Sequence, residues 1–151
     1  MILDEYGEFC DATALNTGAA ASYLVGDVID LGAVTGGQDI GTGEDLYLVI
    51  QVDTTATSGG SATGQFHLAS DAQAAIAVDG TATYHYSGSA IAVATLVAGY
   101  EIACIRLPSG SYERYLGILQ TTAVAAFTAG KINAFLTKTP NKYRSYPDAT
   151  N

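Results

Sequence analysis

The sequence predicts an all-β protein: an antiparallel β-sandwich of the jelly-roll kind, with an extended N-terminal arm and a C-terminal tail. About seven or eight short stretches rich in β-branched and aromatic residues alternate with turn signals about every 8–12 residues, which is typical of sandwiches. No helical apolar pattern is long enough for a β-α-β unit. The 151 residues include 17 glycines and no tryptophan, which favours short strands and tight turns.

The length indicates a single domain over residues 1–151, large enough to bury its own core. We expect the core at about residues 24–137. Residues 1–23 have few large apolar side chains and a run of small ones, which predicts an arm with little regular structure. Residues 138–151 have only Tyr143 and Tyr146 as large apolar groups and predict a tail.

The strongest strand signal is residues 46–53, which are apolar or aromatic up to Val52 apart from Gln51. Such a run, bounded by turn residues, predicts a strand buried on both faces at the centre of the sandwich. Gly41 and Gly43 precede it. The Gly/Ser/Thr/Ala-rich residues 54–64 follow it and predict an exposed loop.

Weaker signals predict the remaining strands in chain order. Residues 91–97 fit either a short helix or a strand. Pro108 and Gly110 predict a turn that joins two strands into a hairpin. The other expected strands are residues 27–31, 65–69, 74–78 (weak), 81–87, 100–107, 112–120 and 131–137.

Charge divides the chain. Residues 1–105 contain 13 Asp and Glu and no Lys or Arg, whereas residues 106–151 contain all six Lys and Arg and two acids. An acidic body repels phosphate, so we expect no nucleic-acid partner. The division allows the basic end to bind an acidic protein surface, on another copy or on another protein. A chance distribution of few cations is the alternative.

Cys10 and Cys104 are isolated in sequence and would pair only if the fold brought their Cα atoms within about 7 Å. Two buried apolar thiols in a reducing compartment are favoured. The N-terminus lacks the pattern of a signal peptide, and no apolar run is long enough to span a membrane. We therefore expect synthesis in the cytoplasm and no membrane partner.

The sequence predicts no catalytic, metal or cofactor site. Gly59-Gly60-Ser61 is not a nucleophile elbow. His67 and His85 have no neighbour at ligand spacing, so strand histidines are favoured over a site. The acidic residues 39–45 do not have the EF-hand pattern, which favours a solvated loop over a Ca²⁺ site.

Aromatic residues offer two further interpretations. Tyr84 and Tyr86, with Tyr100 and Tyr112, could form a sugar-stacking platform, which makes a carbohydrate-binding β-sandwich module the alternative function. Cross-strand packing is the commoner explanation. In the tail, cations alternate with aromatics, which suits docking on an acidic protein surface. The candidate interface residues are Tyr6, Phe9, Lys138, Lys142, Tyr143, Arg144 and Tyr146.

Seven segments stand out by their order and spacing along the chain. They are residues 1–4 (MILD), 9–12 (FCDA), 28–32 (VIDLG), 41–53 (GTGEDLYLVIQVD), 107–110 (LPSG), 114–117 (RYLG) and 127–132 (FTAGKI). In this order and spacing they resemble the capsid cement proteins of tailed bacteriophages, in particular the Bordetella-phage cement-protein type. The resemblance extends to about Thr137, whereas Cys10 and the tail depart from the family pattern.

The resemblance implies a jelly-roll-like sandwich that is a structural virion protein and not an enzyme. Such a protein binds the outer surface of the expanded icosahedral head and cements neighbouring major capsid protein subunits. Its expected partners are the major capsid protein and further copies of itself, as a dimer or trimer.

Overall fold

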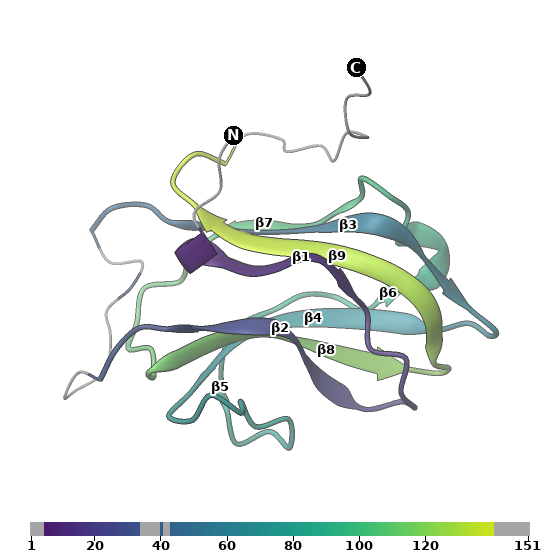
Figure 1. Ribbon diagram of the computed structural model, residues 1–151, viewed down its shortest axis with the longest axis horizontal. Helices are drawn as coiled ribbons and strands as arrows, with labels where there is room; N and C mark the ends of the chain where they lie inside the picture. Colours follow the sequence, from purple (N-terminus) through teal and green to yellow (C-terminus); the bar gives the residue numbers. More distant parts are fainter. Residues whose placement is uncertain (1–4, 34–39, 41–42, 141–151) are drawn as a thin grey trace.

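The protein folds into two antiparallel sheets packed face to face, and the computed structural model describes residues 5–33, 40 and 43–140. One sheet has the order β1 (Glu8–Ala14), β9 (Phe127–Thr137), β3 (Tyr47–Ser58), β7 (Glu101–Arg106). The other has the order β2 (Ser22–Asp30), β8 (Tyr115–Ala123), β4 (Thr63–Asp71), β5 (Thr83–Ser87), and β6 (Ile91–Ala92) pairs with β4. Figure 1 shows the two layers, which confirm the predicted all-β sandwich.

The pairing pattern is that of a jelly roll. The first long strand pairs with the last, β1 with β9, and the next pairs are β2 with β8, β3 with β7, and β4 with β5. The chain is thus a long hairpin wrapped into two sheets. As a result, most strands that follow one another in sequence lie in different sheets.

The core lies between the sheets and is built around β3. Its residues from Leu48 to Val52 are all buried, as the sequence predicts for a central strand. β3 pairs with β7 on one side and with β9 on the other. Leu48, Ile50 and Val52 pack with residues of the facing sheet, including Phe66 and Leu68 of β4 and Ile118 of β8.

The prediction of an arm with little regular structure over residues 1–23 is wrong over β1. Residues 5–7 form a 3-10 turn, η1 (Glu5–Gly7), and β1 then pairs with β9 from Glu8 opposite Phe135 to Ala14 opposite Lys131. Phe9, Cys10 and Leu15 are buried. The alternation of β1 is broken by a bulge at Ala12, whose φ is 44°, and this hides the strand from a period-2 search.

The predicted loop over residues 54–64 is also mostly strand. β3 continues to Ser58 and β4 begins at Thr63, because Thr54, Thr55 and Thr57 are β-branched residues that suit a pleated edge. The weak strand predicted at residues 74–78 is wrong, since that segment is a turn region. Residues 91–97 contain both alternatives, β6 and the 3-10 turn η2 (Val93–Thr95).

The predicted hairpin around Pro108 and Gly110 is wrong, although both strands exist. β7 pairs with β3 and β8 pairs with β2 and β4, so the connection crosses from one sheet to the other. Tyr112 anchors this crossing: it is fully buried, and its hydroxyl donates to the Pro108 carbonyl oxygen at 2.7 Å. The predicted turn does reverse the chain, but it joins strands of different sheets and not two strands that pair with each other.

The two cysteines are free thiols. Cys10 lies on β1 and Cys104 on β7, the opposite edges of the same four-stranded sheet. Three strand spacings separate them, about 14 Å, so their pairing is excluded by the sheet order. Among the described residues, no helix is long and apolar enough to cross a membrane.

We predict that Ile50→Ala destabilises the protein by about 2–5 kcal/mol, because Ile50 is fully buried in β3 and its loss leaves a cavity. Urea unfolding measures the effect. The control is Val97→Ala, at a position 46% exposed, for which we expect a loss of less than about 1 kcal/mol. Equal losses in the two variants would contradict a core centred on β3.

Candidate contact surfaces

At one end of the sandwich, where β3 and β8 begin and β2, β7 and β9 end, acidic and basic side chains lie close together. This end lies at the left of Figure 1, where β9 and β2 terminate. Tyr47, the first residue of β3, is opposite both Arg106 and Thr137. We define the charged end by Tyr6, Asp30, Glu44, Asp45, Arg106, Arg114 and Lys138.

Two ion pairs join the loop before β3 to the strands beside it. Arg106 Nη2 lies 2.8 Å from Asp45 Oδ1, and Lys138 Nζ lies 2.7 Å from Glu44 Oε2. All four side chains are at least half exposed, so each pair contributes little, about 0–1 kcal/mol. Their main consequence is structural, since they hold the ends of β7 and β9 against the segment that enters β3.

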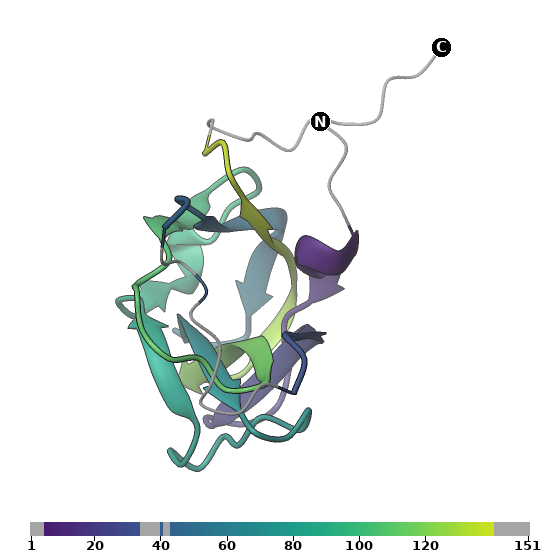
Figure 2. The ribbon, with the colours of Figure 1, turned by 90° about the vertical axis from the view of Figure 1, so that its left-hand side faces the viewer.

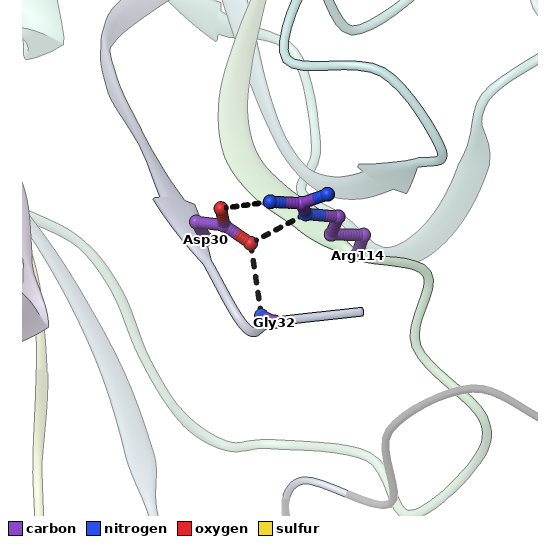
Figure 3. A network of polar contacts seen from close by, with 3 residues as sticks. All are labelled: Asp30, Gly32 and Arg114. Atoms are coloured by element: carbon purple, nitrogen blue, oxygen red, sulfur yellow. Dashed lines mark hydrogen bonds and ion pairs between the residues drawn. The ribbon is translucent and has the colours of Figure 1, made fainter. Parts of the chain in front are cut away.

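The third pair, Asp30 with Arg114, is bidentate (Figure 3). Arg114 Nε and Nη2 donate to the two carboxylate oxygens at 2.9 and 2.8 Å, and the Gly32 amide donates to Asp30 Oδ1 at 2.8 Å. The hydrogen bonds from Arg114, and then from Gly32, lower the pKa of Asp30 from 3.8 to about 2. This fork fixes the end of β2 to the segment that enters β8.

These contacts change the interpretation of the charge division. Arg106, Arg114 and Lys138 come from the basic part of the chain, and each pairs with an acid of the first 105 residues. Part of the predicted attraction between the basic end and the acidic body is therefore satisfied within one molecule. The remaining cations of the tail, Lys142 and Arg144, lie outside the described residues.

The structure separates the candidate interface residues. Tyr6 is 89% exposed at the charged end. Lys138 is exposed beside it and bound to Glu44. Phe9 is only 1% exposed and packs in the core, so its selection as a contact residue is corrected: its side chain points between the sheets. Lys142, Tyr143, Arg144 and Tyr146 lie outside the described residues.

Beside the charged end, a groove of about 650 Å³ runs between β1 and β2, the edge strands of the two sheets. Its lining combines the buried Phe9 and Cys10, the half-buried Val28 and Ile29, and the exposed carboxylates Asp11 and Asp27. Sequence reasoning missed this groove, because β1 was not predicted as a strand.

The opposite end of the sandwich has no charged residue within residues 58–64, 91–100 and 121–130. Pairing brings these segments together: Ser58 is opposite Phe127, and Thr63 is opposite both Ala92 and Ala123. Val124, at the tip, is 76% exposed and has a φ of 70°, which strains a β-branched residue. The long uncharged runs are the sequence signal by which this end could have been predicted.

His67 and His85 hold strands together through hydroxyl groups. His67 Nδ1 lies 2.9 Å from Ser87 Oγ and its Nε2 lies 3.1 Å from Thr121 Oγ1. His85 Nε2 lies 2.7 Å from Ser70 Oγ, and its ring stacks on Tyr112. Burial lowers the pKa of both histidines, so both favour the neutral form. These are strand histidines with structural partners.

The tyrosines do not form the sugar-stacking platform that the sequence allowed. A bulge places His85 between Tyr86, opposite Leu68, and Tyr84, opposite Ala69. Tyr86 packs on the core between the sheets, whereas Tyr84 meets the His67 ring edge-on outside it. Tyr112 is buried. The bulge thus puts Tyr84 and Tyr86 on opposite faces of the sheet.

In the acidic loop over residues 39–45, the described carboxylates Glu44 and Asp45 bind Lys138 and Arg106. Over residues 5–33, 40 and 43–140, no three His, Cys, Asp or Glu side chains gather as metal ligands would. Asp39, Gly41 and Thr42 lie outside those ranges.

The chain matches a protein-family model over most of its length. The model of the Bbp16 family covers residues 9–136, from β1 to the end of β9. No curated protein sequence matches the chain.

We predict that His67→Gln combined with His85→Asn reduces the loss of stability between pH 7 and pH 5. Because the folded pKa values lie below 6.5, the unfolded chain binds protons first as the pH falls, and stability declines below about pH 6.5. Urea unfolding at pH 7, 6 and 5 measures the slope. An unchanged slope in the double variant would show that the histidines do not carry the effect.

A second pH prediction concerns the Asp30–Arg114 fork. The folded pKa of Asp30 is about 2, against 3.8 without partners, so its contribution to stability is present above pH 3.8 and is lost as the pH falls toward 2. Asp30→Asn removes this part of the acid dependence, measured by thermal unfolding between pH 5 and pH 2. Glu101→Gln, which removes one exposed carboxylate on the far edge strand β7, is the control.

Proposed function

Since the chain belongs to the Bbp16 family, a family of phage capsid cement proteins, we propose that it binds the outer surface of the expanded icosahedral head and cements neighbouring major capsid protein subunits. The match over residues 9–136 carries the proposal. The family is structural, which implies a place in the virion and no catalytic role. We propose further that the protein is made in the host cytoplasm and joins the capsid from outside.

The energetic basis of cementing is linkage. A protein that binds the assembled shell, and not its separated subunits, stabilises the shell by RT ln(1 + [L]/Kd), which is about 2.7 kcal/mol at 100 times Kd. If the protein is a dimer or trimer, as we propose, one oligomer binds several capsid subunits at once and gains avidity. Each individual contact can therefore be small.

We place the shell contacts at the charged end and on the tail that follows it. Tyr6 is almost fully exposed there, and Lys138 leads directly into the tail. The tail residues Lys142, Tyr143, Arg144 and Tyr146 add cations and aromatics. Tyrosine and arginine are enriched among residues that dominate binding energies, whereas exposed ion pairs contribute less.

Co-sedimentation with heads tests the proposed function. Purified protein is mixed with expanded heads that lack it and, in parallel, with unexpanded proheads. We expect saturable binding to expanded heads at a fixed number of copies per head, and at least tenfold weaker binding to proheads. Absence of binding to expanded heads would contradict the cement role for this chain.

The residues of the tail are tested by Tyr143→Ala combined with Tyr146→Ala in the full chain. We expect binding to expanded heads to weaken at least fivefold, which corresponds to about 1 kcal/mol. Tyr84→Ala, which removes an exposed tyrosine on β5, is the matched control and should bind as wild type does. Equal binding of all three proteins would place the contacts elsewhere.

A further inference from the structure

The groove between β1 and β2 is a gap between two strand edges. β1 pairs with β9 and β2 pairs with β8, so the edges that border the groove are the ones turned away from those partners. The two strands touch at Gly26, where a Cβ atom would collide with the Phe9 carbonyl oxygen. Beside that point the strands separate, and the groove opens.

Both edge strands are irregular where they border the groove. β1 has a positive φ at Ala12, and β2 has one at Gly26 with a register shift between Val25 and Ile29. Such bulges prevent the two edges from pairing with each other and turn side chains outward. The groove is consequently a built feature of the backbone and offers both apolar surface and strand edge to an extended peptide.

The groove is electronegative. Asp11 and Asp27 border it from the two strands, and both are exposed. The thiol of Cys10 lies among its lining residues: burial raises the pKa of this thiol to about 12, and the charges of Glu8, Asp11 and Asp27 raise it as well. An occupant that carries cations and apolar groups in alternation would complement this lining.

The chain supplies such a segment at the right place. β9 ends at Thr137 beside η1, since the Gly7 Cβ position would lie 3.6 Å from the Leu136 carbonyl oxygen, and Figure 2 shows η1 near the end of β9. Residues 141–151 begin Asn-Lys-Tyr-Arg-Ser-Tyr. Fully extended they reach about 36–40 Å, whereas the stretch of β1 from Glu8 to Thr13 spans about 17 Å.

We propose that in the free protein the C-terminal tail, residues 141–151, lies in the groove between β1 and β2 of its own chain, with Lys142 and Arg144 on its carboxylates. Tyr143 or Tyr146 then covers the apolar part of the lining. The short connection from Pro140 gives the tail a high effective concentration at its own groove, in the millimolar range. This high effective concentration favours docking of the tail in the groove of its own chain over docking in the groove of a second copy.

Groove occupancy would also regulate the tail. If the tail contacts the shell, which rests on the proposed function, the groove and the shell compete for it. The tail would then be held on the body until the capsid displaces it. The inference about the free protein does not depend on that consequence, so the two are tested separately.

The test uses the full chain with a nitroxide spin label on Ser145→Cys in a Cys104→Ser background; Cys10 is buried and remains unlabelled. In ¹⁵N-labelled protein, we expect the amide signals of Asp27 and Val28 to lose more than half their intensity relative to the reduced label. Lys142→Glu with Arg144→Glu, or 1 M salt, should restore them, since screening then acts over about 3 Å.

Two controls make each outcome decisive. Asp27→Asn should weaken the broadening, whereas Glu101→Gln on β7 should not. The second control is a mixture of ¹⁵N protein that lacks the nitroxide and ¹⁴N protein that carries it. Broadening in this mixture reports binding between copies. Strong broadening of the groove signals in the mixture would overturn docking on the same chain, because a tail bound to its own groove leaves those signals intact there. No broadening of them in either sample would overturn the groove as the binding site of the tail. This experiment does not measure binding to heads. A negative result would therefore overturn the docking of the tail without contradicting the cement role, which co-sedimentation tests.

Discussion

The antiparallel pairing of β3 with β9 is the interaction on which the rest of the structure depends. It joins residues near position 50 to residues near position 130, and it places both strands inside their sheet. β1 and β7 are then added to the two sides. The start of β3 and the end of β9 lie together, so Glu44 meets Lys138, and the pairing of β3 with β7 brings Asp45 to Arg106. Two of the three ion pairs at the charged end therefore follow from the register of β3 with its two neighbours.

The sequence predicts the existence of most strands but not their partners. Residues 46–53 were recognisable because burial on both faces leaves a continuous apolar run. β1 was missed because the bulge at Ala12 breaks its alternation, and the extensions of β3 and β9 were missed because threonine, alanine and glycine fill both strands and loops. The hairpin at Pro108 was wrong for a topological reason: local turn chemistry reports a reversal of direction, not the sheet to which the next strand belongs.

The candidate surfaces were predictable only in part. The charge division was visible in the sequence. In the structure, three of the cations form ion pairs with acidic residues of the same molecule. Phe9 was misassigned because a large aromatic in a segment without a recognised strand resembles a contact residue. Predicting the groove required knowledge that β1 and β2 are neighbouring edges, which depends on their pairings with β9 and β8, strands that lie 85 or more residues further along the chain. The groove adjoins the charged end, since Tyr6 and Asp30 belong to both.

Cryo-electron microscopy of expanded heads reconstituted with the protein would show whether and where it binds the shell. We expect added density on the outer surface, shaped as a β-sandwich and in contact with two or more neighbouring capsid subunits, with the charged end toward the shell. Density that touches a single subunit, or that lies on the inner surface, would contradict cementing from outside.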